Sequence, residues 1–180
     1  MRIAVLMGGV SDEREVSLSS GVQVASALRN LGHTVVVVDT VRGSLDEAEE
    51  ALLLKVGVGA LPPLVGELAS LDEMQTVMLS GNSALSEIDV FFLALHGGSG
   101  EDGTVQALLE VAGVAYTGSN RLGCSLAMDK EVSKRLLRQA GVPTPDWLCG
   151  EYSAAEVADT LGLPVIVKAV SGGSSLRLVL

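Results

Sequence analysis

Short apolar runs alternate with a longer polar segment over the first forty residues. Residues 3–7 are apolar and end at two glycines, which predicts a buried strand. Ser11 or Asp12 is expected to cap the helix that follows. Its apolar positions near helical spacing are Val16, Ala25, Leu28 and Leu31. The β-branched run 34–38 predicts a second strand, so the segment is expected to form a βαβ unit.

Residues 40–86 have the least regular pattern. A helix is predicted at 45–55 and a short strand at 76–79, and the region is interpreted as an insertion or a lid-like excursion. Regular spacing returns after it. The expected elements are a strand at 90–95, a loop at 96–103, a helix at 104–112 and a strand at 114–117.

The pattern changes character beyond residue 118. A charged amphipathic helix is predicted at 127–139, another helix at 152–160, and a strand at 163–168 that leads into a Gly/Ser loop. The sequence therefore predicts an α/β fold class. A doubly wound parallel-sheet domain is expected over residues 1–120, and an incomplete second domain over 121–180.

Composition narrows the function classes. The 180-residue chain is 48% hydrophobic but only 3% aromatic, which favours an aliphatic core of strands covered by helices. A net charge of −10 disfavours nucleic acid as a partner. Cys124 and Cys149 are expected to be free thiols in a reducing compartment. No apolar run approaches the roughly 20 residues that span a bilayer, so we expect a cytoplasmic protein without membrane contact.

Two loops after predicted strands carry candidate chemistry. The acidic segment 11–15 follows two glycines; it suits an ammonium group, although a capped surface helix explains it as well and is preferred on composition alone. His96 opens the second loop, where either ligand recognition or a backbone partner accounts for it. Gly98, Gly100 and Gly103 match the dinucleotide spacing G-x-G-x-x-G. We reject a nicotinamide site, because acidic residues stand where phosphate would approach.

A third constellation lies near the end of the sequence. Lys168 closes a predicted strand and precedes Gly172-Gly173-Ser174-Ser175, a loop rich in backbone donors that suits phosphate oxygens. An ordinary turn is the alternative, and from the residues alone a charged helix face explains Lys130. The sequence contains only two histidines and no His-Glu-x-x-His, so a metal site is poorly supported.

Taken in order, these segments resemble the D-alanine–D-alanine ligases of the ATP-grasp superfamily. The matching blocks are Val5–Gly9 with Ser11–Leu18, His96–Gly103, Tyr116–Ser119, Ala127–Lys130, Leu161–Lys168 and Gly173–Ser175. The resemblance covers nearly all of the chain except about 40–86. It implies a pre-ATP-grasp, Rossmann-like N-terminal domain followed by the start of an ATP-grasp domain.

The resemblance also implies an activity. That family joins two D-alanine molecules with ATP through an acyl phosphate, which supplies a peptidoglycan precursor for cell wall biogenesis and cell shape. Its cofactors are ATP and Mg²⁺, or Mn²⁺, with the metal ligands expected beyond Leu180. A homodimer is expected, as is common in the family.

The roles of individual residues follow from the same resemblance. Glu13 looks like the carboxylate that holds the ammonium of the first D-alanine, which reverses the preference for a capped surface helix. Val16 and His96 look like parts of the same substrate pocket. Lys130 and Lys168 look like nucleotide and phosphate contacts. Ser174 looks like a catalytic loop serine linked to Glu13, and Ser175 like a phosphate contact.

Some residues depart from the family pattern. Ala169 stands where proline is usual, and Leu176-Arg177 follows the serine pair where an apolar residue and glycine are usual. Two alternatives therefore stay open. One is a non-catalytic module that binds a D-amino acid or nucleotide, and the other is an ATP-grasp ligase with a different second substrate.

Overall fold

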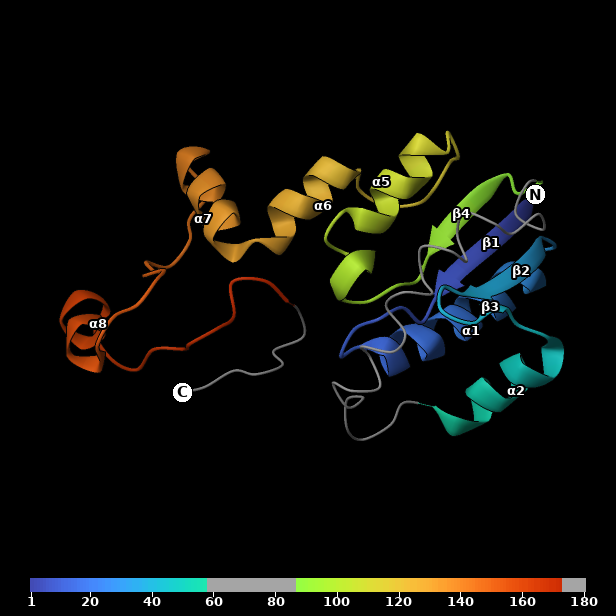
Figure 1. The fold of residues 1–180 in the computed structure, drawn as a ribbon, viewed down its shortest axis with the longest axis horizontal. Coiled ribbons are helices and arrows are strands. Elements are labelled where there is room, and N and C mark those ends of the chain that lie inside the picture. The colour runs from blue at the N-terminus through green and yellow to red at the C-terminus, as the bar shows by residue number, and fades with distance from the viewer. Residues whose placement is uncertain (58–86, 173–180) are drawn as a thin grey trace. The chain divides into compact units, whose positions relative to one another are not determined.

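The computed structural model describes residues 1–57 and 87–172 (Figure 1). The chain divides into two compact units, Met1–Cys124 and Ser125–Leu180, and each is considered by itself. Assignment of the second unit to an ATP-grasp domain stays a prediction. In the described part of the chain, no helix has the length and apolar character needed to cross a membrane.

A four-stranded sheet forms the centre of the first unit. Strands β1 (Arg2–Met7), β2 (Thr34–Asp39) and β4 (Val90–Leu93) are parallel, and the short β3 (Gly43–Ser44) joins the edge of β2 antiparallel. The order is β3-β2-β1-β4. The first two predicted strands are confirmed. The third ends two residues earlier than expected, because the chain turns after Leu93 into the loop that carries His96.

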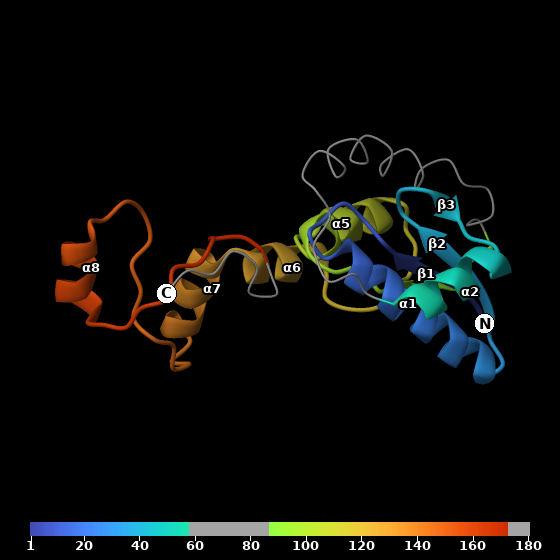
Figure 2. The same cartoon turned by 90° about the horizontal axis from the view of Figure 1, so that it is seen from below.

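Helices cover both faces of this sheet, as the doubly wound prediction requires (Figures 1 and 2). Helix α1 (Arg14–Asn30) connects β1 to β2, and α2 (Glu47–Val56) packs beside it. Helix α5 (Thr104–Val111) lies on the other face, after the one-turn 3₁₀ helix η2 (Gly98–Gly100). The α/β fold class is therefore confirmed, with a mixed sheet that is mainly parallel.

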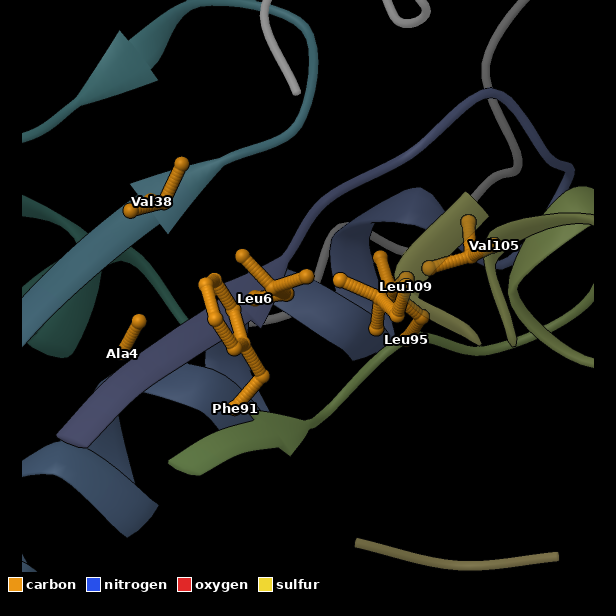
Figure 3. Close-up of a cluster of buried hydrophobic side chains, with 7 residues drawn as sticks. All are labelled: Ala4, Leu6, Val38, Phe91, Leu95, Val105 and Leu109. Carbon is orange, nitrogen blue, oxygen red and sulfur yellow. The ribbon is translucent and has the colours of Figure 1, made fainter. Parts of the chain in front are cut away.

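Alternation along β1 divides the core into two layers. Ala4 and Leu6 face α5, whereas Val5 and Met7 face α1, because successive side chains of a strand point to opposite faces. Figure 3 shows the α5 side, where Leu6 lies beside Phe91 of β4 and Leu95 meets the α5 side chains. The core side chains drawn there are all aliphatic apart from Phe91, as the composition predicts.

The buried face of α1 differs from the predicted one. Val16 and Leu31 are exposed at 38% and 74%, and only Ala25 of the predicted set is fully buried. The face toward the sheet consists of Ser17, Leu18, Gly21, Val22 and Ala25, together with Arg14. Small and polar residues occupy this face because the helix approaches β1 closely: a Cβ on Gly21 would lie 2.4 Å from the Met7 sulfur.

Two further segments of the first unit differ from the predicted pattern. Residues 114–117 do not form a strand; only Tyr116 pairs, through one bridge to Phe91, because the chain turns at Gly118 into α6 (Arg121–Met128). Of the region 40–86, interpreted as an insertion or a lid-like excursion, the described residues 40–56 pack on the first unit, with Leu45 and Leu53 on the α1 side of the core; the interpretation of the rest lies outside the described residues. The strand predicted at 76–79 lies outside the described residues.

Glu110 of α5 anchors the segment 116–121 through hydrogen bonds and an ion pair. Its carboxylate accepts hydrogen bonds from the Tyr116 hydroxyl at 2.7 Å and from the Arg121 backbone nitrogen at 3.0 Å. Both bonds hold the pKa of Glu110 below its usual value, and the bond from the Arg121 backbone has the larger effect. The Arg121 guanidinium completes the contact, with Nε 3.0 Å from the second carboxylate oxygen.

The second unit contains α7 (Lys130–Gln139) and α8 (Ala154–Leu161). The predicted continuous helix at 127–139 is instead divided at Asp129, whose extended backbone and side chain cap α7. The predicted strand at 163–168 does not form; Val167 alone makes a bridge, and Ile166 and Val167 are exposed. The described part of this unit contains no strand against which the apolar run could pair.

Candidate functional site

The loops after β1 and β4 meet at the carboxyl edge of the sheet. The Ser11 hydroxyl donates to the His96 carbonyl at 2.6 Å and accepts from the Glu13 backbone nitrogen at 3.2 Å. Adjacent parallel strands bring their carboxyl ends together, so residues 85 positions apart become neighbours. Ser11 therefore links the two predicted substrate-binding segments.

The Glu13 carboxylate lies directly over the backbone of Gly97. A Cβ on Gly97 would come within 2.7 Å of Glu13 Oε2, and within 3.2 Å of the Ser11 Cβ. Gly97 has φ 67° and ψ 175°, a conformation that essentially only glycine adopts. Glu13 itself is 6% exposed. The second loop thus leaves room for a largely buried carboxylate by lacking a side chain at this position.

Ser17 joins the ends of β1 and β4 beneath these loops. Its fully buried hydroxyl accepts from the Gly8 nitrogen at 2.8 Å and donates to the Ala94 carbonyl at 2.7 Å. Neither backbone group belongs to a regular strand pairing at that point, so the serine replaces a missing ladder bond. This contact fixes the start of α1 against both strand ends.

Arg14 and Asp39 form a buried ion pair on the other side of β1. Each terminal guanidinium nitrogen engages one carboxylate oxygen, with Nη1 3.0 Å from Oδ1 and Nη2 in contact with Oδ2. Arg14 Nη1 also donates to the Gly9 carbonyl at 3.1 Å, and Asp39 Oδ1 accepts from the Val41 nitrogen at 3.0 Å. A two-point pair of this kind fixes direction as well as distance.

The remaining predicted pocket residues lie at the margin of this edge. His96 is half-buried and Val16 is 38% exposed on the first turns of α1. The Gln106 side chain of α5 stabilises the loop that follows His96 by donating a hydrogen bond to the Gly100 carbonyl at 2.7 Å. The structure therefore places Glu13, Val16 and His96 in the first unit, around the ends of β1 and β4.

The predicted nucleotide contacts lie in the second unit. Lys130 Nζ donates to the carbonyls of Val170 and Gly172 at 3.4 and 2.6 Å, so its ammonium lies at the entrance to the Gly/Ser loop. Lys168 is exposed. Ser174 and Ser175 lie outside the described residues. Across 1–57 and 87–172, no cluster of three or more His, Cys, Asp or Glu side chains could hold a metal ion.

Sequence reasoning missed the residues that organise this site. The predicted cap, Ser11 or Asp12, is wrong: α1 begins after Glu13, which makes no side-chain cap, and the Ser11 hydroxyl bonds the His96 carbonyl and the Glu13 nitrogen in the preceding turn. The sequence predicts no role for Arg14 and Asp39, because a charge pair 25 positions apart has no local signature. One local signal was present: Ser17 and Gly21 lie four positions apart on one face of α1, and such small residues indicate a close approach to the sheet.

Comparison with known proteins gives a consistent result. The family model described as D-ala D-ala ligase N-terminus matches residues 2–119. The D-alanine–D-alanine ligase of Moorella thermoacetica is 42% identical, with 98% of this chain and 48% of the relative covered. That of Aquifex aeolicus is 38% identical over 99% of this chain and 50% of the relative.

Solved structures of the same enzyme are also similar. The D-alanine–D-alanine ligase of Bacillus anthracis has a TM-score of 0.66 at 35% identity, covering 99% of this chain and 48% of that one. The enzyme of Coxiella burnetii has a TM-score of 0.70 at 28% identity, covering 99% and 55%. This chain spans about half the length of the relatives it matches. It belongs to the D-alanine–D-alanine ligase family, whose N-terminal region it matches.

Proposed function

We propose that the protein in its full-length form is an ATP-dependent D-alanine–D-alanine ligase. In this proposal the enzyme joins two D-alanine molecules through an acyl phosphate and supplies a peptidoglycan precursor. The Glu13 carboxylate, held over Gly97 at the carboxyl edge of the sheet, carries the proposal. Family membership supports the reaction class, and the edge geometry supports the residue roles.

Glu13 is suited to an amine substrate. Its carboxylate is largely removed from water, and charge attraction to an ammonium is much stronger there than in bulk solvent. The neighbouring loops are anchored through Ser11, so the carboxylate does not have to be reorganised when substrate arrives. Val16 and His96 would then border the bound amino acid.

The second unit is suited to hold nucleotide phosphates. Lys130 and Lys168 supply ammonium groups, and the loop at 172–175 supplies backbone and serine donors, with Ser174 and Ser175 as the assigned contacts. ATP with Mg²⁺, or Mn²⁺, would supply the phosphoryl group and screen its charge. Lys130 already orients the loop entrance through two carbonyls, and an ammonium has a third hydrogen to offer.

The direct test uses protein expressed from the complete gene. D-alanine-dependent ADP release is measured for the wild type, for Glu13→Gln and for Glu15→Gln. Glu15 is a matched control, since it lies in the first turn of the same helix with an equal charge. We expect Glu13→Gln to lower kcat/KM for D-alanine by on the order of 100-fold, because neutralising the contact removes a buried charge pair. Glu15→Gln should be close to wild type.

Each contrary result has a distinct meaning. Binding of D-alanine in calorimetry without any ADP release would favour the non-catalytic binding module. ADP release with D-alanine paired to another amino or hydroxy acid would favour the related ligase. Equal activity of Glu13→Gln and wild type would refute the role assigned to Glu13.

A further inference from the structure

The first turn of α1 is anchored on both sides of the central strand β1. On the β4 side, Ser11 and Ser17 bond the His96 and Ala94 carbonyls. On the β2 side, the Arg14 guanidinium reaches the Asp39 carboxylate at the end of that strand. In the sequence Glu13 lies between Ser11 and Arg14. Its carboxylate turns toward the β4 loop while its neighbour Arg14 turns toward β2.

The Arg14–Asp39 pair is enclosed by the turn that precedes Glu13. A Cβ on Gly8 would lie 2.5 Å from Asp39 Oδ1 and 2.6 Å from Arg14 Nη1, so the Gly8 backbone packs directly on the two charges. Arg14 Nη1 also bonds the Gly9 carbonyl. Any shift of the pair would therefore move the turn, and with it the start of α1.

Burial makes these contacts directional and hard to replace. Arg14 is 6% and Asp39 1% exposed, so water cannot substitute for a lost partner. The planar fork of arginine meets both carboxylate oxygens, which fixes rotation as well as separation. A lysine at 14 could keep the charge but would meet the carboxylate at a single point.

We propose that the Arg14–Asp39 ion pair positions the Glu13 carboxylate over Gly97 and so sets the affinity for the amino-acid substrate. This inference rests on the proposed function, in which Glu13 binds the substrate ammonium. Arg14 is a positioning residue, because it touches Asp39 and Gly9 and acts on the substrate only through Glu13. A displacement of the carboxylate by about 1 Å is enough to lower activity by roughly 100-fold.

The test uses the full-length protein and separates KM for D-alanine from KM for ATP. We expect Arg14→Met to raise KM for D-alanine by about 10-fold or more, with KM for ATP unchanged. Arg14→Lys should fall between Arg14→Met and wild type, since it keeps the charge without the fork. Asp39→Asn preserves the size of the side chain and one acceptor, so it provides a second variant if Arg14→Met does not fold.

Arg29→Met is the matched control. Arg29 lies at the other end of α1 and forms the same two-point pair with Glu50, at 2.5 and 2.9 Å. Its loss should lower Tm while leaving both KM values at the wild-type level. A merely structural role for Arg14 predicts the same outcome for Arg14→Met.

The possible results distinguish the two proposals. If Arg14→Met and Asp39→Asn lower Tm but leave KM for D-alanine unchanged, while Glu13→Gln raises it, the positioning role is overturned and the function of Glu13 stands. If Glu13→Gln also leaves KM for D-alanine unchanged, the proposed function fails, and the positioning role falls with it. A selective rise in KM for D-alanine in both pair variants supports the inference.

Discussion

Replacing Gly97 by alanine tests the geometry of the site where the Gly97 backbone and the Glu13 carboxylate approach each other closely. The backbone there has φ 67° and ψ 175°, and an alanine held in this region costs about 1–3 kcal/mol. The new Cβ would also stand 2.7 Å from Glu13 Oε2. To reach ordinary contact at 3.4 Å, the carboxylate would have to retreat by about 0.7 Å.

These two effects are measured separately. Urea unfolding of the full-length protein should show Gly97→Ala less stable by about 1–3 kcal/mol. D-alanine-dependent ADP release should show kcat/KM lowered by on the order of 10- to 100-fold, because the displaced carboxylate no longer meets the ammonium. Gly113→Ala is the control: its φ is 69° but a Cβ there has open space, so it carries the backbone cost of about 1–2 kcal/mol without touching Glu13.

Two results would refute this reasoning. Wild-type stability of Gly97→Ala would mean that position 97 does not require a glycine conformation. A kcat/KM for D-alanine no lower than that of Gly113→Ala would mean that the contact between Gly97 and Glu13 does not govern substrate binding.

Two further predictions concern stability. Ser17→Ala should lower the free energy of unfolding by about 2–4 kcal/mol, because the buried Gly8 N–H and Ala94 carbonyl lose their partner. In urea unfolding Ser19→Ala, whose hydroxyl on the same helix makes only a solvent-exposed bond to Gln23, should change it by under about 0.5 kcal/mol. The hydrogen bonds that lower the pKa of Glu110 keep it charged in the folded state, so its stabilisation should be complete above the ordinary value of about 4.3 and disappear as pH falls through the lower folded pKa. Urea midpoints of wild type and Glu110→Gln, compared from pH 7 to pH 3, should therefore converge at low pH, and a constant difference would contradict this.

The local hydrophobic pattern predicted a helix or strand correctly where local residues alone decide the element. The runs at 3–7 and 34–38 are strands whose apolar side chains pack between two helical layers, fully buried along 3–7 and at 37–38. The capping box of Asp46 and Glu49 begins α2 close to the predicted position. The pattern predicted the wrong buried face of α1. The helix lies so close to β1 that small residues such as Ser17 and Gly21 occupy the buried positions, where large apolar residues were expected.

Strand predictions failed where pairing with a neighbour did not extend beyond a single bridge. The apolar run at 163–168 has the composition of a strand, but a strand exists only when its backbone groups are paired with a neighbour. Residues 114–117 do lie beside β4, but they make only one bridge to it because the chain turns at Gly118 into α6. No local pattern reports whether a partner is present.

The sequence by itself determined the fold class, the positions of the glycine-rich loops and the resemblance that assigns Glu13 and His96 to one pocket. Only the tertiary structure decided how that pocket is built: Ser11 bonding the His96 carbonyl, Glu13 over Gly97, and Arg14 paired with Asp39. The physical reason is the separation of the partners along the chain. Parallel strands β2, β1 and β4 bring distant residues to one edge, and the hydrogen bonds made there leave no periodic trace in the sequence.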